Sequence, residues 1–464
     1  MPVNTEKLKN ITIAYIGGGS LHWAYDLMHD LALDGDIEGT VRLYDIDIPA
    51  AQQNEIYGNR LAQHQKAASR WKYTVSNTLK EALAGADFVI ISIFPGTFED
   101  MRVEVHMPEE YGILQPVGDT VGPGGLFRAL RLIPVFCEFA RAIEEFAPDA
   151  WVINYTNPMS LCVATLYSEY PGIKAFGCCH EVFGTQKLLA AMVEEVFEEK
   201  YVQRDEIVIN VLGLNHFTWL TRAFYKTEDL FPGFLKFADT YYTEGFEKLE
   251  SWQKNVFQCA HRVKFDLFRR FGCIAAAGDR HLAEFIPEKY VQDKFSVAQW
   301  KFHLTTIEDR IIRRNNRIKE VAAHLSGEKP VVLEQSEEEG VRIMKALLGL
   351  GNFVTNANLP NMGQIHNCGQ HAIVETNVLF MKDSACPVIA GKIPGPLEET
   401  INGHIANQQL ILKAALKKDQ ELAFQAFRND PLVTCDDNDA EELFFKMLSG
   451  LAHCLPGWKI PQKK

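Results

Sequence analysis

The sequence predicts a doubly wound α/β domain followed by a second domain of α+β structure. Three observations predict this fold class. Short apolar runs alternate with helical patterns up to about residue 200, a glycine-rich turn follows the first apolar run, and the alternation stops near residue 207. A chain of 464 residues suits this division, because a domain commonly takes roughly 150 residues. We therefore expect a first domain over residues 1–200 and a second over residues 201–464.

The strands of the first domain are predicted from short apolar runs that end at turn residues. The run 88–94 is strongly apolar and stops at Pro95-Gly96. The expected strands are 11–16, 41–44, 72–75, 88–94, 151–155 and 174–178. The first expected helix ends near residue 33. Further helices are expected over about 50–69, 79–83 and 126–146, after Pro158, and over about 185–197. This spacing indicates βαβ units and a parallel sheet of the Rossmann type.

The second half of the chain has a different pattern. A strand over residues 207–214 leads directly into Asn215-His216, and long mixed helices follow. A second strand-like set lies around residues 353–374. No repeat, low-complexity tract or flexible linker separates the halves, so we expect them to share a large interface.

Composition and charge exclude several classes of function. The chain has 47 Lys and Arg against 60 Asp and Glu, a formal net charge of −13, which argues against a nucleic-acid or anionic-membrane binder. The longest apolar run, 88–94, is far shorter than the roughly 20 residues of a membrane span, and no secretion signal opens the chain. Ten scattered cysteines without CxxC spacing fit a reducing compartment, so we expect a cytoplasmic protein.

The first strand-turn-helix is the predicted nucleotide end. Gly17-Gly18-Gly19-Ser20 follows the first strand, and Gly17 and Gly19 occupy the first two positions of the dinucleotide fingerprint. His22 stands where the third glycine is expected, so the motif is incomplete. Asp45 ends the second strand, where a carboxylate accepts both ribose hydroxyls of NAD and repels the 2′-phosphate of NADP. The alternative is an ordinary glycine turn in another α/β protein.

Two residues at predicted strand ends have side chains that bind metals. Cys179 follows the strand 174–178, and His216 follows the strand 207–214. A thiolate and an imidazole suit a borderline divalent ion, although each residue taken alone is more often structural. The vicinal pair Cys178-Cys179 rarely forms an unstrained disulfide, which leaves a thiol for other chemistry.

Three further segments carry polar groups at turns or helix starts. Asp119 lies in a glycine-rich loop before a helix, where an aspartate either takes part in catalysis or caps a turn. Asn154 and Asn157 flank a strand end before Pro158, where amides bind sugar hydroxyls or nicotinamide, or form a turn. Asp279 opens a segment rich in ionisable groups and is otherwise a helix N-cap.

These segments, in this order, resemble glycoside hydrolase family 4, a family of NAD- and Mn-dependent glycosidases. The resemblance covers nearly the whole chain, from the glycine turn to the segment 359–367. Within the family, Cys179-His180-Glu181-Val182 is similar to the signature of the α-galacturonidase branch. The α-galactosidase branch typically has serine at the position of Glu181.

The resemblance implies a role for individual residues. Cys179 and His216 match the metal ligands, and Arg102 and Asn157 match substrate-contacting positions. His180 is the expected proton donor. Many members use a tyrosine as base; here Asp279 stands in its place by spacing from His216, with Asp119 nearby to share its role.

The mechanism implied by the family begins with hydride transfer from C3 of the sugar to NAD⁺. The ketone, polarised by the divalent ion, acidifies the C2 proton, which a base removes while an acid assists the leaving group. Water then adds and NADH returns the hydride. The resemblance also implies a homodimer or homotetramer and a small uronide substrate.

Other functions remain open from the sequence. Within the family, α-galactoside or α-glucoside hydrolysis is the alternative to α-galacturonide hydrolysis. Outside it, an NAD-dependent 2-hydroxy-acid dehydrogenase of the lactate/malate type shares the nucleotide domain but needs no metal. A catalytically silent NAD-binding regulator is the third alternative. A uronide carboxylate requires a cationic pocket, for which the candidates are Arg102, Arg128, Arg131 and Arg280.

Overall fold

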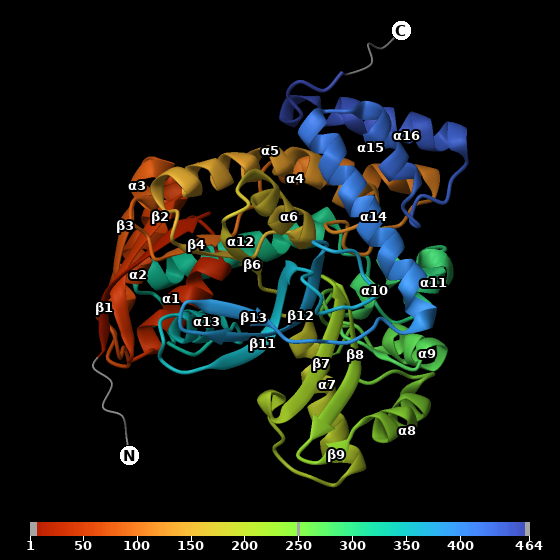
Figure 1. The fold of residues 1–464 in the computed structure, drawn as a ribbon, viewed down its shortest axis with the longest axis horizontal. Helices are drawn as coiled ribbons and strands as arrows, with labels where there is room; N and C mark the ends of the chain where they lie inside the picture. The colour runs from red at the N-terminus through yellow and green to blue at the C-terminus, as the bar shows by residue number, and fades with distance from the viewer. Residues whose placement is uncertain (1–6, 248–250, 460–464) are drawn as a thin grey trace.

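One nine-stranded sheet runs through the molecule, and both halves of the chain contribute strands to it (Figure 1). The computed structural model describes residues 7–247 and 251–459. Six parallel strands have the order β3-β2-β1-β4-β5-β6, which is the strand order of dinucleotide-binding folds. Their bounds are β1 (Leu8–Ile16), β2 (Ile37–Tyr44), β3 (Lys72–Val75), β4 (Phe88–Ile91), β5 (Trp151–Asn154) and β6 (Lys174–Gly177).

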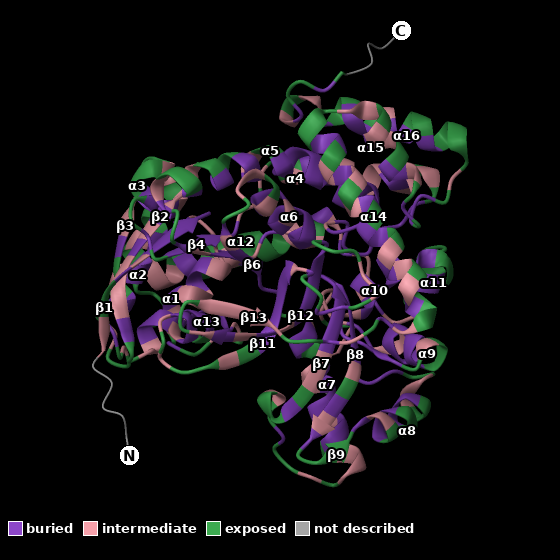
Figure 2. Cartoon of the chain, viewed as in Figure 1, coloured by how far each residue is buried: buried purple, intermediate pink, exposed green. Residues whose placement is uncertain are grey.

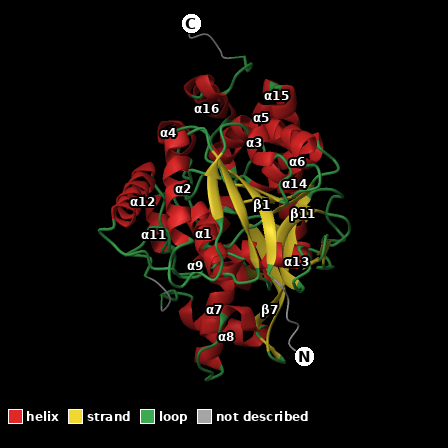
Figure 3. Ribbon diagram, turned by 90° about the vertical axis from the view of Figure 1, so that its left-hand side faces the viewer, coloured by secondary structure: helices red, strands yellow, loops and turns green. Residues whose placement is uncertain are grey.

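Helices cover both faces of this sheet (Figure 3). The helices of the N-terminal half are α1 (Trp23–Leu33), α2 (Ile48–Leu61), α3 (Leu79–Leu83), α4 (Phe98–His106), α5 (Gly122–Phe146), α6 (Met159–Glu169) and α7 (Glu181–Val196). Of these, α4 packs against α5 and α7 packs against residues 207–241 rather than on this sheet. All four residues of β4 are buried, as are most residues of the other central strands (Figure 2). This double coverage explains why these strands are continuous apolar runs in the sequence.

The predicted doubly wound fold is confirmed, and the element bounds differ for local reasons. β2 begins at Ile37, earlier than predicted, because Gly39 lets the β1 backbone approach: a Cβ there would lie 1.8 Å from the Ile11 carbonyl oxygen. α5 begins at Gly122, although glycines 122, 124 and 125 disfavour helix, because tertiary packing buries its first turns. The expected strand 88–94 leaves the sheet after Ile91, and α2 ends at Leu61.

Strands from the second half extend the same sheet. β11 (Phe353–Pro360), β12 (Ile373–Met381) and β13 (Ser384–Pro387) are antiparallel to one another, and β11 pairs with β6 through Asn358 and Gly177. The sheet therefore crosses the boundary proposed at residue 200, and that boundary stays a prediction. The crossing places β12 beside the turn that carries His216, because β12 packs against β7.

A smaller sheet forms beside the first. It contains β7 (Ile207–Leu214), β8 (Phe217–Tyr225), β9 (Glu228–Asp229) and β10 (Ile274–Ala275), packed with α8 (Phe231–Tyr241) and α9 (Arg262–Phe271). The remaining helices are α10 (Asp279–Phe285), α11 (Lys294–Gln299), α12 (Ile307–Ser326), α13 (Gly340–Leu347), α14 (Gly395–Lys417), α15 (Gln420–Arg428) and α16 (Asp437–Gly450).

Two findings bear on the expectations from composition. Within the described ranges, none of the helices has the length and apolar character needed to cross a bilayer. All ten cysteines are free thiols, and Cys178 and Cys179 are both buried. The absence of a vicinal disulfide leaves the Cys179 sulfur available as a ligand.

Candidate active site

The glycine turn after β1 forms a close-packed cradle. Gly17 has φ +95°, and a Cβ there would lie 2.0 Å from the carbonyl oxygen of Ser92. The Gly19 amide donates to Asp45 Oδ2 at 2.8 Å, which ties the turn to the end of β2. The N-cap of α1, His22, makes no side-chain capping bond. A glycine turn, a helix N-terminus and an acidic residue at the end of β2 fit a dinucleotide.

The two asparagines near the end of β5 differ in what they offer a ligand. Asn154 is fully buried and closes a turn, with its Nδ2 donating to the Thr156 carbonyl at 3.0 Å and its Oδ1 accepting from the Thr156 amide at 3.1 Å. Asn157 precedes a cis proline, and its buried Oδ1 has no hydrogen-bond partner within the described residues. Asn157 is therefore the one with a free acceptor for a sugar hydroxyl or cofactor amide.

A hydrogen-bond relay fixes the orientation of His216. His216 lies in the tight turn between β7 and β8 with φ +64° and is buried. Thr120 Oγ1 donates to Asp119 Oδ1 at 2.7 Å and lies 2.8 Å from His216 Nδ1. Because the hydroxyl proton goes to Asp119, Nδ1 must carry the proton that the Thr120 oxygen accepts. The lone pair of His216 is therefore on Nε2, which is left free for a metal.

Asp119 and His281 lie next to this imidazole. One ligand atom each from Asp119, His216 and His281 falls within 4.8 Å of the others, and the two imidazole rings are 3.8 Å apart. Burial alone would raise the pKa of Asp119, but the positive charges of Arg128 and Arg310 hold it well below its usual range. Burial lowers the pKa of His216 to about 3, with His281 adding to the effect, so its imidazole is neutral as a ligand requires.

Cys179 is held beside the same turn by residues of both halves. It follows β6 and is buried. Asn356 donates to the Cys179 carbonyl at 3.1 Å, while Glu375 accepts from Asn356 at 2.6 Å and from Asn215, the neighbour of His216, at 3.3 Å. Thiol, imidazole and carboxylate together fit a divalent first-row metal.

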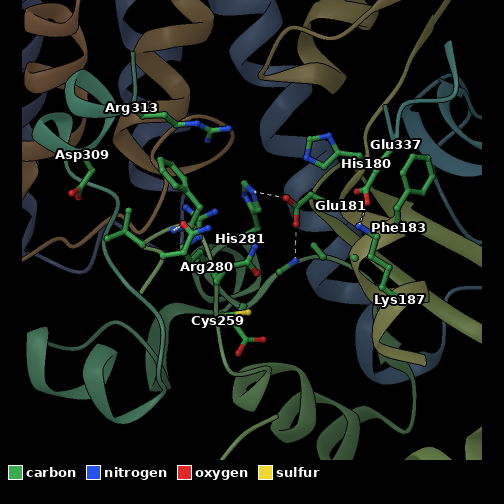
Figure 4. Close-up of a pocket in the computed structure, with 18 of the residues that line it drawn as sticks. His180, Glu181, Phe183, Lys187, Cys259, Arg280, His281, Asp309, Arg313 and Glu337 are labelled. Carbon is green, nitrogen blue, oxygen red and sulfur yellow. Dashed lines mark hydrogen bonds and ion pairs between the residues drawn. The ribbon is translucent and has the colours of Figure 1, made fainter. Parts of the chain in front are cut away.

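A cavity of about 860 Å³ reaches this cluster at His281, whereas Cys179, Asp119 and His216 are not among its lining residues. Figure 4 shows His180 and Glu181 on one side and Arg280 and Arg313 on the other, with His281 between them and joined to Glu181. Glu181 accepts from the Gly278 amide at 2.8 Å and lies 3.6 Å from His281 Nε2. The cavity therefore brings charged groups from α7, α10 and α12 together.

His180, the predicted proton donor, lines this cavity. Its Nδ1 lies 3.0 Å from Glu338 Oε1, and its ring stacks on Trp23 at 5.4 Å. Desolvation lowers its pKa, but the hydrogen bond and charge of Glu338 outweigh this and raise the pKa above the usual value. With Nδ1 committed to Glu338, Nε2 is the atom that can deliver a proton.

Asp279 is placed in a different cluster from His216. Its carboxylate accepts the backbone N–H of Val263 and Lys264 at 3.1 Å, which caps α9, and its neighbours are Cys259 and His261. Residues two apart on a helix point in nearly opposite directions, so Asp279 faces α9 while His281 faces His216. Burial raises the pKa of Asp279 to about 6. The role of Asp279 as the base stays a prediction. His281, not Asp279, lies beside His216 and Asp119.

Arg102 is not among the residues that line the cavity. It lies on α4 and forms ion pairs with Glu99 at 3.2 Å and Glu308 at 2.5 Å, and its side chain is 36% exposed. Its substrate contact stays a prediction. The sequence alone gives no role to Thr120 or His281, and Glu181 is recognisable only as part of a signature. The signals were present, since Thr120 adjoins Asp119 and His281 lies two residues after Asp279, but only tertiary structure shows what they touch.

Comparison with known proteins identifies the family of the chain. Two family models match the chain: "Family 4 glycosyl hydrolase" over residues 12–195 and its "C-terminal domain" over residues 211–433. A protein of Thermoanaerobacterium saccharolyticum named alpha-galacturonidase is 54% identical over 457 residues, covering 98% of each chain.

Solved structures extend the comparison to the fold. A Bacillus subtilis protein described as the putative glucosidase lplD has a TM-score of 0.91 at 52% identity, covering 95% of this chain and all of that one. A 6-phospho-alpha-glucosidase from gut microorganisms, solved with NAD and Mn²⁺, has a TM-score of 0.81 at 19% identity, covering 98% of this chain and all of that one; it shows the shared fold. On the strength of both family models, the chain belongs to family 4 of the glycosyl hydrolases.

Proposed function

We propose that this protein is an NAD- and Mn²⁺-dependent α-galacturonidase. The observation that carries the proposal is a tautomer-fixed His216 whose turn is joined to Cys179 through Asn215, Glu375 and Asn356, in a chain 54% identical over nearly its full length to a protein named alpha-galacturonidase. A 2-hydroxy-acid dehydrogenase needs no metal and therefore no thiol and imidazole as metal ligands. Glycosidase chemistry of the elimination type needs such ligands.

The residues present fit both cofactors. Gly17-Gly18-Gly19-Ser20 and Asp45 would hold NAD, and Cys179 and His216 would hold the metal, with Asp119 acting through Thr120. When bound, NAD takes and returns a hydride, and the metal acts as a Lewis acid at the substrate oxygens. Asn157 Oδ1, a buried acceptor without a partner among the described residues, is placed to orient a substrate hydroxyl.

The arrangement of arginines supports a uronide as the substrate. Arg131 is neutralised by Glu104 at 2.7 Å, and Arg128 donates to the Asn157 carbonyl near Asp119. Arg102 lies in its exposed ion pairs. Arg280 lines the cavity and forms no ion pair within the described residues, which makes it the best placed of the four for a C6 carboxylate. A galactoside or glucoside would leave this guanidinium uncompensated.

Proton transfers are assigned to groups at the cavity wall. His180, oriented by Glu338 through Nδ1, protonates the departing oxygen through Nε2. We retain Asp279 as the proton acceptor at C2, with His281 as the alternative that its contact with His216 favours. We also infer that the protein is a homo-oligomer. A cytoplasmic location is our further inference, with which the ten free thiols are consistent.

The proposal is tested by incubating reduced protein with NAD⁺, Mn²⁺ and α-1,4-digalacturonide in D₂O. We expect galacturonate to be released with deuterium at C2 and without net formation of NADH. Comparison of Asp279→Asn with His281→Asn then identifies the base, because loss of the base stops C2 exchange. Cleavage of α-galactosides but not galacturonides would replace the substrate, and NADH accumulation on hydroxy acids would overturn the proposal.

A further inference from the structure

The cavity is lined by five carboxylates and six Lys or Arg side chains, and two of the arginines have no ion-pair partner among the described residues. Its five carboxylates all have partners: Glu181 with His281 and the Gly278 amide, Asp279 with the α9 N-terminus, Asp309 with Thr306, Glu320 with Arg317, and Glu337 with Lys187. Arg280 and Arg313 also line the cavity, and within the described ranges neither forms an ion pair. Two guanidinium groups therefore remain for anions supplied by a ligand.

These two arginines share one aromatic ring. The guanidinium carbon of Arg280 lies 5.5 Å from the ring centre of Phe257, and that of Arg313 lies 4.5 Å from it. The two guanidinium carbons are therefore separated by no more than the sum of these two distances. Arg280 also donates to Thr305 Oγ1, whereas no protein hydrogen bond to the Arg313 guanidinium is found within the described residues. The pair forms two adjacent cationic positions on one wall.

The two positions differ in their distance from the predicted chemistry. Arg280 is adjacent in sequence to His281, whose ring contacts His216, so it belongs to the inner part of the cavity. Arg313 comes from α12 and is exposed, so it belongs to the mouth. A cavity of about 860 Å³ lies at the upper end of the range for drug-sized ligands, larger than one sugar ring needs.

We propose that Arg313 binds the carboxylate of the leaving sugar, so that the site recognises a digalacturonide by two carboxylates. Arg280 contacts the carboxylate of the galacturonate ring whose C1–O bond is broken. Arg313 contacts the carboxylate of the leaving sugar on the other side of that bond. The inference rests on the proposed function and adds a requirement on the leaving group. A uronide with a neutral leaving group would satisfy only the inner position.

The phosphates of the dinucleotide are the other anions near α12. Arg317, one helical turn further along, donates to the Leu21 carbonyl beside the glycine turn and pairs with Glu320. Arg313 lies on the same face but toward the N-terminus of α12, over Phe257 and beside Arg280. This position favours the sugar side, and the experiment separates the two anions.

The experiment compares two substrates on three variants. With α-1,4-digalacturonide, Arg313→Met should raise KM about tenfold, as expected for the loss of a charged hydrogen bond at an open site. With p-nitrophenyl α-galacturonide, whose leaving group is uncharged in the bond, KM should be unchanged. Arg313→Lys should recover part of the digalacturonide affinity. Arg314→Met is the matched control, because Arg314 neighbours Arg313 on α12, removes the same charge and does not line the cavity.

The outcomes are distinct. An equal KM change on both substrates, or none on digalacturonide, overturns the role of Arg313. A weaker NAD⁺ affinity of Arg313→Met, measured by titration without substrate, would instead assign this arginine to the nucleotide phosphates. If the unmodified protein hydrolyses neither galacturonide, the proposed function fails before the inference is reached.

Discussion

The two ends of the candidate active site are built in different ways. The nucleotide end is local: β1, the glycine turn and the end of β2 lie within residues 8–45. Hydrogen bonds from Gly17 and Gly18 to the Tyr44 carbonyl and from Gly19 to Asp45 join them. The metal end is assembled from the loop of Asp119, the end of β6, the β7–β8 turn and α10, with Glu375 of β12 supporting it. A local site depends on backbone shape, whereas an assembled site depends on side chains that hold one another.

Substitution of a single side chain is therefore expected to abolish metal binding at the metal end. Cys179→Ala removes the buried thiol, and we expect Mn²⁺ binding to be lost and kcat/KM to fall by about 1000-fold or more. Electron paramagnetic resonance of free Mn²⁺ measures the binding, and titration with NAD⁺ should be unchanged. Retention of full Mn²⁺ affinity would exclude Cys179 as a ligand.

At the nucleotide end, a substitution that distorts the backbone is expected to weaken both stability and NAD⁺ binding. Gly17→Ala places a Cβ 2.0 Å from the Ser92 carbonyl oxygen at φ +95°, so we expect a loss of about 3 kcal/mol in free energy of unfolding and weaker NAD⁺ binding. Denaturant titration and NAD⁺ titration measure the two effects.

Gly403→Ala is the matched control for that change. Gly403 lies in α14 with no atom within 4 Å of an added Cβ, so alanine should stabilise the protein by up to about 1 kcal/mol. Similar destabilisation by both substitutions would mean that the strain at Gly17 is not the cause.

The same contrast explains what the sequence could predict. The glycine turn and Asp45 were identified because the motif is contiguous and its strand order follows from alternation. The position of Cys179 follows from the carboxyl edge that parallel strands share. His216 also lies at a strand end, but β7 belongs to the smaller antiparallel sheet. The sequence could not show that His281 rather than Asp279 faces His216, because that depends on the rotation of a seven-residue helix. Nor could it show that strands from residues 353–387 continue the first sheet.

Thr120 links the Asp119 loop to the His216 turn, and its removal should weaken the metal site without abolishing it. Thr120→Val keeps the shape but leaves His216 Nδ1–H without an acceptor and Asp119 without a donor. We expect Mn²⁺ affinity to fall about tenfold, as for other groups that orient metal ligands. Thr120→Ser, which keeps the hydroxyl, should bind Mn²⁺ nearly as the unmodified protein does. Equal affinity in both variants would show that the relay does not orient His216.

The smallest effect is expected at Arg102, which belongs to neither end in this structure. Its ion pairs with Glu99 and Glu308 are exposed, and such pairs contribute little to stability. Arg102→Met should leave the thermal midpoint nearly unchanged and alter KM for digalacturonide by less than about twofold. A large rise in KM with unchanged kcat would mean that substrate draws Arg102 away from Glu308 and into the cavity. The metal end would then include a contact that forms only on binding, which neither motif nor unliganded geometry can reveal.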